Sequence, residues 1–321
     1  MRKRILVTSR SFGKIARAPA EWLETQGFEL NTTDRPRPLS EDDMIALIRD
    51  MDAVIVGNDK VTAPVLAAGN RLKVVSMHGV GVNHIDVAAA ERHGVVVTNV
   101  PGANSEAVAE LAIGLLFACA RRIVESHVST RAGGWERFAG VEIQGKTLGV
   151  VGFGRIGQAV ARRAKALGCR VLACDPVADT EAAKQMDVTL TDLDTLLSDA
   201  DFVSLHLPLT PETEKTINSE SLMKMKPGGI LINTSRGGVV DEAALAETLR
   251  SGHLAAAGVD VYAKEPPISS PLMGVENCIM LSHIGAYSIE ALERMGMTAA
   301  RNAAAVLRGE TPEHVVRSSA P

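Results

Sequence analysis

The amino-acid sequence predicts an α/β protein built from two parallel sheets, each covered by helices. Two observations carry this prediction. Short runs rich in valine and isoleucine alternate with segments of helical periodicity, and most of these runs are apolar throughout, as in parallel strands buried on both faces. The alternating series occurs twice within 321 residues, a length that suits two domains better than a single core.

The first series occupies roughly the first hundred residues of the chain. Its short apolar runs predict strands at 4–9, 52–58, 72–79 and 94–99. The segments between and before them predict helices at 18–27, 41–51, 62–70 and 86–94.

The second series begins near residue 145. It predicts strands at 147–154, 169–176, 201–208, 228–235, 256–262 and 278–285. It predicts helices at 154–168, 192–200, 219–226 and 241–252.

Two longer helical segments connect and close these series. Residues 105–128 are expected to form one apolar helix that bridges the two domains. Residues 288–309 are expected to form a last helix that crosses back to pack on the first domain. The first domain would then contain both ends of the chain.

Composition argues against several classes of protein. Aromatic residues make up only 3% of the chain and the net charge of −4 comes without a basic stripe, so nucleic acid is not an expected partner. The N-terminal apolar run is too short for a secretory signal, and residues 111–120 are too short to span a membrane. The four cysteines and eight histidines show no metal-ligand spacing. We therefore expect free thiols in a reducing cytoplasm and no metal site.

A glycine pattern in the second series predicts dinucleotide binding. GVVGFGRIGQAV contains Gly152, Gly154 and Gly157 between a predicted strand and a predicted helix, which is the context that a dinucleotide fold requires. The first glycine allows the tight turn, the second lets the backbone approach a pyrophosphate, and the third lets helix and strand pack closely. The helix N-terminus then offers amide donors to phosphate.

An acidic residue follows this pattern at the expected distance. Asp175 ends the next predicted strand, about 20 residues after the glycines. A carboxylate there accepts hydrogen bonds from both ribose hydroxyls and repels a 2′-phosphate. The sequence therefore predicts NAD rather than NADP, against the alternative of a glycine-rich turn without a ligand.

Polar residues lie at the ends of two later strands. Thr234 lies at the carboxyl end of the strand at 228–235 and Arg236 directly follows it, and ligands of open α/β sheets bind at such ends. A planar guanidinium suits a carboxylate, although position alone leaves Arg236 equally well a solvated loop residue.

Asp260 and Glu265 lie near the end of another strand, and His283 stands alone in the segment LSHIG. A carboxylate beside an imidazole orients it and favours its protonated form. From the residues alone, His283 is either structural or a proton carrier, and Glu265 is either its partner or a surface charge before a proline.

The first series contains one glycine-flanked turn, Gly79-Val80-Gly81. Exposed amides in such a turn can hold a carboxylate. An ordinary loop between a strand and a helix is the alternative.

Together these segments closely resemble the D-isomer-specific 2-hydroxyacid dehydrogenases, the family of phosphoglycerate, glycerate and formate dehydrogenases. The resemblance covers nearly the whole chain, and several independent motifs occur in the family's order and spacing. These motifs are GKTLGVVGFGRIGQAVARRAKALG, LHLPLTPET, MKPGGILINTSRGGVVDEAAL, AAGVDVYAKEPP and LSHIG.

The resemblance implies a role for each matching residue. Arg236 resembles the arginine that binds the substrate carboxylate and polarises the 2-keto group. His283 resembles the general acid/base, and Glu265 its orienting partner. Asp260 resembles the carboxylate near the nicotinamide amide, and Val80 and Gly81 the backbone donors for the substrate carboxylate. The remaining cofactor contacts implied are Gly152, Gly154, Arg155, Ile156, Gly157, Asp175, Pro208, Thr213 and Thr234.

The resemblance also implies the domain organisation and the assembly. The expected fold has two Rossmann-like or flavodoxin-like domains with a cleft between them. Residues 101–286 would bind NAD, while residues 1–100 and 287–321 would form the substrate domain. A homodimer through the cofactor domain is expected, without the C-terminal regulatory domain of long phosphoglycerate dehydrogenases.

The substrate is predicted only as a class. Phosphoglycerate-specific members carry arginines before the glycine turn and near the preceding strand end. This chain has Met77 and His78 at the first place and Asn58, Asp59 and Lys60 at the second. Arg137 still matches a basic position that the neighbouring subunit contributes in some members. We expect a 3-phosphoglycerate-, glycerate/hydroxypyruvate- or sulfolactate-type acid, or glyoxylate.

Two alternatives remain open at this point. One is oxidation of phosphite, which occurs in the same fold. The other is a protein that senses NAD(H) and binds a partner without catalysis. The presence of Arg236, Glu265 and His283 together favours an enzyme.

Overall fold

The computed structural model describes residues 2–36 and 38–318 and divides into two compact units. One unit combines Met1–Asn104 with Tyr287–Pro321, and the other is the continuous segment Ser105–Ala286. Each unit is an α/β structure around its own sheet, which confirms the predicted fold class. None of the described helices is long and apolar enough to cross a membrane.

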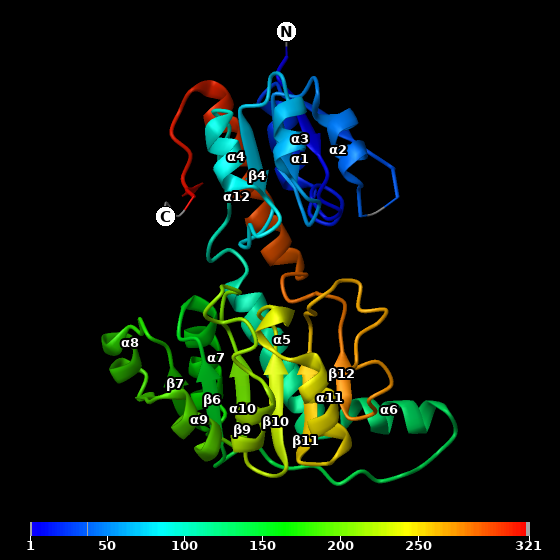
Figure 1. Cartoon of the computed structure of the whole chain (residues 1–321), viewed down its shortest axis with the longest axis vertical. Coiled ribbons are helices and arrows are strands. Elements are labelled where there is room, and N and C mark those ends of the chain that lie inside the picture. The colour runs from blue at the N-terminus through cyan, green and yellow to red at the C-terminus, as the bar shows by residue number, and fades with distance from the viewer. Residues whose placement is uncertain (1, 37, 319–321) are drawn as a thin grey trace. The chain divides into compact units, whose positions relative to one another are not determined.

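The larger unit, Ser105–Ala286, contains a parallel sheet of seven strands in the order β12-β11-β10-β9-β6-β7-β8 (Figure 1). The strands are β6 (Thr147–Val151), β7 (Arg170–Cys174), β8 (Thr189–Leu190), β9 (Phe202–Leu205), β10 (Gly229–Asn233), β11 (Leu254–Val259) and β12 (Cys278–Met280). Its helices are α5 (Ser105–Ala120), α6 (Ile123–Arg131), α7 (Arg155–Ala166), α8 (Thr180–Gln185), α9 (Leu193–Asp199), α10 (Ser219–Lys224), the short 3₁₀ helix η1 (Gly237–Val239) and α11 (Glu242–Arg250).

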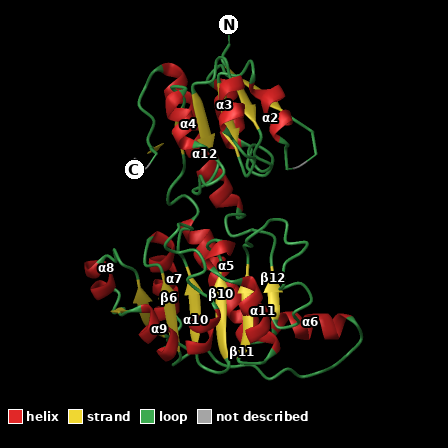
Figure 2. Ribbon diagram, in the orientation of Figure 1, coloured by secondary structure: helices red, strands yellow, loops and turns green. Residues whose placement is uncertain are grey.

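Helices cover both faces of this sheet (Figure 2). Side chains of α5, α7 and α8 pack on one face, and those of α9, α10 and α11 pack on the other. Successive strand residues alternate between the two cores, so that Leu148 and Val150 face the first core and Val151 faces the second. This double burial explains why the strand sequences are apolar throughout.

The smaller unit has a sheet in the order β13-β5-β4-β3-β1-β2. Its strands are β1 (Arg4–Val7), β2 (Glu29–Thr32), β3 (Ala53–Val56), β4 (Val74–Met77), β5 (Val96–Thr98) and β13 (Val315–Val316). Its helices are α1 (Ala18–Thr25), α2 (Glu41–Ile48), α3 (Ala63–Ala68), α4 (Val87–Arg92) and α12 (Ile289–Arg308). All pairs are parallel except β13 with β5, where the end of the chain returns antiparallel.

Helix α12 returns to the first part of the chain, as the periodicity of 288–309 predicts. It begins at Ser288, whose side chain accepts a hydrogen bond from the amide of Ala291, and ends at Gly309 in the left-handed conformation. The helix packs against α1, β3 and β4. Contact with α1 is close at Gly296, where a Cβ atom would lie 2.6 Å from Pro19 Cγ.

Each sheet has one position at which the strand order reverses. In the larger unit, β7 and β9 lie on opposite sides of β6, so the switch falls between β6 and β9. In the smaller unit, β2 and β3 flank β1, and the switch falls between β1 and β3. Loops leave in opposite directions at such a point, and ligands of open α/β sheets bind in the crevice beside the strands' carboxyl ends.

The structure corrects one predicted helix and adds elements that the sequence did not reveal. The expected single helix 105–128 is two helices, α5 and α6, separated at Arg122, which has a φ of +53°. The guanidinium of Arg122 lies over the ring of Phe138 and donates to Glu125 Oε1 at 3.1 Å, which fixes the break. Strands β2, β8 and β13 and helix α8 were not predicted, because each is short and lacks a clear apolar period.

Candidate functional site

The structure brings His283 and Glu265 together although they are 18 residues apart. His283 Nδ1 lies 2.8 Å from Glu265 Oε2 and 3.0 Å from Oε1. Glu265 lies in the loop after β11 and His283 in the loop after β12, which pairs with β11 in the sheet. Because the two strands are parallel neighbours, both loops emerge at the same edge.

The loop that carries His283 is held by a buried carboxylate. Asp260, at the end of β11, accepts hydrogen bonds from the amide of Ile284 at 2.8 Å and from the amide of Gly285 at 2.7 Å. His283 itself has a φ of +57°, a conformation that is uncommon for residues other than glycine. Burial raises the pKa of Asp260, while the two amide donors counteract this shift. Asp260 therefore fixes the backbone of the two residues that follow His283.

Arg236 lies beside this pair. It follows β10 and its Nη1 donates to the carbonyl of Ser235 at 2.6 Å. Its neighbour Gly237 packs against the loop after β11, since a Cβ atom there would lie 1.8 Å from the carbonyl carbon of Tyr262. Only glycine allows this approach, which brings the arginine loop against the loop of Glu265.

The three charges influence one another. Burial lowers the pKa of Arg236, and the nearby carboxylate of Glu265 opposes this shift. Burial alone would raise the pKa of Glu265, but the hydrogen bond from His283, the amide of Tyr262 and the charge of Arg236 hold it below its usual range. Glu265 is therefore ionised at neutral pH, as an orienting partner of an imidazole must be.

The glycine turn after β6 is built as its spacing predicts. Gly152 has a φ of +93°, and a Cβ atom there would lie 2.5 Å from the carbonyl oxygen of His206. A Cβ atom on Gly157 would lie 2.0 Å from the carbonyl oxygen of Gly152, so the third glycine allows α7 to approach the turn. A Cβ atom on Gly154 would meet nothing within 4 Å, which leaves an open face at the turn.

The N-terminus of α7 points its free amides at this open face. The helix has no side-chain cap, and no described residue accepts a hydrogen bond from the amides of Arg155 or Ile156. Uncapped amides and the positive end of a helix dipole attract phosphate.

Asp175 lies at the end of β7, beside the glycine turn. Its Oδ2 accepts a hydrogen bond from the amide of Phe153 at 2.7 Å, and its Oδ1 accepts one from the amide of Val177 at 2.9 Å. These bonds fix the carboxylate in place and leave each oxygen a second lone pair for a ribose hydroxyl.

Two buried polar atoms at the same edge of the sheet lack a partner among the described residues. These atoms are Thr234 Oγ1, after β10, and His206 Nδ1, after the adjacent strand β9. The imidazole of His206 bonds Ser204 Oγ through Nε2 at 2.9 Å, and burial lowers its pKa to about 3. Buried polar atoms are normally satisfied, so both fit a polar ligand at this edge. Sequence reasoning missed His206, although its place at a strand end was a usable signal.

Pro208 and Thr213 lie in the loop after β9. Thr213 Oγ1 donates to the carbonyl of Pro208 at 2.6 Å and accepts from the amide of Thr210 at 2.8 Å. The hydroxyl thus fixes its own loop, and a cofactor contact by either residue stays a prediction.

The glycine turn of the smaller unit also presents free amides. No described residue accepts a hydrogen bond from the amides of Val80 or Gly81, while the carbonyl of Val80 accepts from Asn99 Nδ2 at 2.8 Å. The turn is therefore fixed through its carbonyl, with its donors available for an anion.

Met77 and His78, which stand where phosphoglycerate-specific members carry an arginine, turn their side chains inward. Met77 is 5% exposed and His78 is 7% exposed, and both pack inside the smaller unit. Asn58 and Lys60, in the loop after β3, are exposed. Arg137 is also exposed, in the segment after α6.

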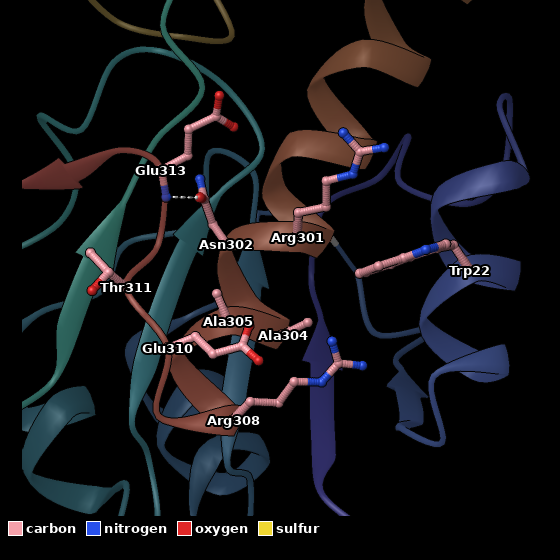
Figure 3. A pocket seen from close by; sticks show the side chains of 9 residues that line it. All are labelled: Trp22, Arg301, Asn302, Ala304, Ala305, Arg308, Glu310, Thr311 and Glu313. Carbon is pink, nitrogen blue, oxygen red and sulfur yellow. Dashed lines mark hydrogen bonds between the residues drawn. The ribbon is translucent and has the colours of Figure 1, made fainter.

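Within the described residues, no three His, Cys, Asp or Glu side chains are grouped to hold a metal ion. A hollow of about 290 Å³ lies between α1 and the end of α12, lined by Trp22, Arg301, Arg308, Glu310, Glu313 and neighbours (Figure 3). Here the amide of Glu313 donates to Asn302 Oδ1 at 2.9 Å, which ties the returning chain to the helix. None of the predicted site residues lines this hollow, and its cationic and anionic side chains are balanced.

Comparison with known proteins agrees with these features. Residues 113–285 match the family model "D-isomer specific 2-hydroxyacid dehydrogenase, NAD binding domain". The chain is 47% identical to a D-3-phosphoglycerate dehydrogenase of Mycobacterium leprae, over 83% of this chain and 51% of that protein. It is 45% identical to a hydroxypyruvate reductase of Thermotoga maritima, over 81% of this chain and 86% of that protein. The chain thus spans about half the length of the phosphoglycerate dehydrogenases it matches.

Solved structures are similar to nearly the whole chain. The TT0316 protein of Thermus thermophilus is 40% identical, with a TM-score of 0.88 over 98% of this chain and 99% of that chain. The D-lactate dehydrogenase of Escherichia coli is 32% identical, with a TM-score of 0.87 over 98% of this chain and 99% of that chain.

Proposed function

Because the chain belongs to the D-isomer-specific 2-hydroxyacid dehydrogenase family and carries its NAD-binding domain, we propose that it interconverts a 2-hydroxy acid and its 2-keto acid. The observation that carries this proposal is the pairing of His283 with Glu265 beside Arg236. An oriented imidazole and a cation for a carboxylate are the groups that proton transfer at C2 requires.

Residues of the larger unit would hold NAD. The amides at the start of α7 suit the pyrophosphate, and the carboxylate of Asp175 suits both ribose hydroxyls. A 2′-phosphate would bring negative charge to this carboxylate, which supports NAD over NADP. When bound, the nicotinamide supplies the hydride acceptor for oxidation and the hydride donor for reduction.

His283 would move the proton. With Nδ1 bonded to Glu265, its Nε2 is the nitrogen available to a substrate. In oxidation, neutral His283 takes the proton of the 2-hydroxyl group; in reduction, protonated His283 returns it to the carbonyl oxygen. Glu265 keeps the ring oriented.

Arg236 would bind the acid. The guanidinium would bond the substrate carboxylate and stabilise negative charge that builds on the 2-keto oxygen. The free amides of Val80 and Gly81 are also suited to a substrate carboxylate. We keep 3-phosphoglycerate-, glycerate/hydroxypyruvate- and sulfolactate-type acids as the substrate class.

The test follows NADH by absorbance with purified protein and a panel of acids. The panel holds 3-phosphoglycerate, D-glycerate, hydroxypyruvate, glyoxylate, D-lactate and both sulfolactate isomers, with phosphite as an outlier. Turnover of at least one 2-hydroxy or 2-keto acid supports the proposal. Tight NADH binding without turnover of any acid would favour a sensing protein instead, and turnover of phosphite alone would replace the substrate class.

We also propose that the protein is a homodimer. Helix α6 buries no side chain within this chain, and its Val128 is 60% exposed. Trp135, in the segment that follows, is 80% exposed. Residues 123–137 thus form an exposed arm, and its large apolar side chains suit an interface with a second copy of this chain. A dimer would also allow Arg137, on the same arm, to reach the neighbouring subunit's substrate.

We also propose that the protein is located in the cytoplasm. Cys119, Cys169, Cys174 and Cys278 are all free. Free thiols fit a reducing compartment, where disulfides are rare.

A further inference from the structure

The glycine turn of the smaller unit has little rigidity of its own. Gly79 and Gly81 flank Val80, and glycine leaves the backbone free to adopt many conformations. The amides of Val80 and Gly81 suit an anion best when they are held in one direction before it binds. Contacts from outside the turn therefore decide how well these amides can receive an anion.

Two consecutive residues after β5 hold both carbonyls of the turn. The amide of Val100 donates to the carbonyl of Gly79 at 3.1 Å, and Asn99 Nδ2 donates to the carbonyl of Val80 at 2.8 Å. The peptide bonds that follow these two carbonyls are both trans. Each carbonyl thus belongs to the same peptide group as one of the two free amides.

The planarity of the peptide bond means that a fixed carbonyl also fixes the amide that follows it. In a trans peptide, the two groups lie in one plane and point in opposite directions. The bond from Asn99 to the carbonyl of Val80 therefore points the amide of Gly81 away from Asn99. The bond from Val100 acts in the same way on the amide of Val80. Neither amide has an acceptor among the described residues.

Asn99 is itself anchored from behind. Its carbonyl accepts a hydrogen bond at 3.2 Å from Nδ2 of Asn302, a residue of α12 that is 1% exposed. Asn302 Oδ1 accepts from the amide of Glu313 at 2.9 Å (Figure 3). Strand β13 pairs with β5 at Thr98, directly before Asn99. The backbone of Asn99 is therefore held independently of its side chain.

We infer that Asn99 is a positioning residue, which aims the amide of Gly81 at the carboxylate of the substrate. Within the described part of the chain, its side chain forms a hydrogen bond only with the carbonyl of Val80. This inference rests on the proposed function, in which the free amides of the turn suit a substrate carboxylate. A donor that is already aligned loses less conformational entropy on binding, so the affinity for the acid depends on Asn99.

Asn99→Ala removes the side-chain amide and keeps the backbone carbonyl that α12 holds. Asn277→Ala is the matched control, because Asn277 is also half-buried and its Nδ2 donates to the backbone carbonyls of Leu249 and Ala255 in the larger unit. Both full-length variants are compared with the wild type by steady-state assays, fluorescence titration of NADH and thermal unfolding.

We expect Asn99→Ala to raise KM for the acid at least about tenfold, the size of one lost charge-assisted hydrogen bond. Because the carboxylate does not react, kcat should change less than about threefold, and NADH affinity should change as little. The thermal midpoint should fall no further than in Asn277→Ala, which should keep the KM of the wild type. A purely structural role would lower the thermal midpoint without a selective rise in KM.

An NMR titration observes the amide of Gly81 directly. Protein labelled with ¹³C at valine carbonyls and ¹⁵N in glycine shows the glycines that follow a valine, which are Gly57, Gly81 and Gly152. The probe is oxamate, an unreactive analogue of a 2-keto acid, added to the NADH-saturated protein. The Gly81 signal should move in the wild type, and half-saturation in Asn99→Ala should need at least about tenfold more oxamate. The Gly152 signal, at the turn after β6, should respond to NADH equally in both proteins.

Two results overturn the inference while leaving the proposed function intact. They are a KM in Asn99→Ala equal to that of the wild type, and a rise in KM that an equal loss of NADH affinity accompanies. Absence of turnover with every acid would instead reject the proposed function. The titration still decides the inference in that case: weaker binding of oxamate at Gly81 in Asn99→Ala supports it, whereas equal binding, or a signal that does not move in the wild type, overturns it.

Discussion

His283 adopts a left-handed backbone conformation that strains most side chains, and the surrounding contacts maintain it. Asp260 holds the next two amides and Glu265 holds the ring. Strain of this kind persists only where the neighbouring structure enforces it. The geometry therefore presents one imidazole in one orientation at the edge of the sheet.

Replacement of His283 by Asn removes the titrating group but tolerates the left-handed backbone. We expect NADH affinity to change little and turnover to fall by about 10² or more, since general acid/base catalysis contributes that much. Steady-state assays together with fluorescence titration of NADH measure both quantities. Turnover equal to that of the wild type would mean that another group moves the proton.

Glu265→Gln keeps the size of the side chain but removes its charge. The charge-assisted hydrogen bond between the carboxylate and Nδ1 of His283 becomes weaker, so the imidazole is held less firmly. We expect kcat for 2-keto acid reduction to fall at least about tenfold while NADH affinity changes little, as steady-state assays and fluorescence titration of NADH would measure. A kcat equal to that of the wild type would show that Glu265 does not act on His283.

His78 gives a prediction about stability rather than catalysis. Its native pKa of about 4 lies below its ordinary value of 6.5, so between these values the unfolded chain binds a proton that the native state does not. Its contribution to stability is full above pH 6.5 and is lost as the pH falls toward 4, by about 3 kcal/mol in total.

Denaturant unfolding of His78→Gln against the wild type, from pH 7 to pH 4.5, measures this contribution. The wild type should lose more stability over this range than the variant. His206, which behaves similarly, is unchanged in both proteins and cancels in the difference. Parallel curves for the two proteins would contradict the burial of a neutral His78.

At the residue scale, the sequence predicted neighbours within one βαβ segment better than contacts between distant loops. The glycines after β6 and the carboxylate of Asp175 follow a pattern contained within one βαβ segment, and they lie together in the structure. The contact between His283 and Glu265 joins two different loops, so only the family resemblance suggested it. Burial of Met77 and His78 could not be read from the sequence, because a strand end can lead either inward or outward.

Among the elements, the turn between β6 and α7 is the most constrained. A methyl group on Gly157 would collide with the carbonyl oxygen of Gly152, and backbone cannot move aside as a flexible side chain can. Gly157→Ala should therefore displace α7 from the turn, weaken NADH binding at least about tenfold and lower the thermal midpoint. Calorimetric NADH titration and thermal unfolding measure both effects.

Gly114→Ala is the matched control within the same unit. Gly114 is an exposed position of α5 where a Cβ atom would meet nothing within 4 Å. Alanine there should stabilise the helix by about 0.5–1 kcal/mol and leave NADH affinity unchanged. Normal NADH affinity in Gly157→Ala would contradict the close approach of α7 to the turn.

The sequence predicted long elements better than short ones. Helices α7 and α12 have clear periods and the buried strands are continuous apolar runs, and their predicted positions are confirmed. The two-residue strands β8 and β13 depend on pairing with distant partners rather than on a local pattern. The break at Arg122 contains no glycine or proline, so helical periodicity continues through it and gave no warning.

At the scale of the whole molecule, the proposed homodimer depends on the exposed arm, residues 123–137. Val128→Glu together with Trp135→Lys would place charges in an apolar interface, so a dimer should dissociate to a monomer. Light scattering coupled to size exclusion at micromolar protein measures this. Ile268→Lys, at an exposed apolar residue in the loop after β11, should leave the dimer intact. A monomeric wild type under these conditions would contradict the proposal.

The two α/β units themselves were accessible from the sequence, because each repeats the same alternation of apolar strands and amphipathic helices. What the sequence could not supply is the physical setting of the charges, such as the buried Asp260 that holds the loop of His283. Ion pairs and burial arise from contacts between elements that are distant along the chain.

The central claim is that hydride is exchanged between NAD and C2 of an acid while His283 moves the proton. NADH deuterated at both C4 positions, mixed with the panel of 2-keto acids and analysed by mass spectrometry, tests it most directly. We expect a 2-hydroxy acid that carries one deuterium at C2, formed at least about 10² times more slowly by His283→Asn. A product without deuterium, or no product from any acid, would contradict the claim.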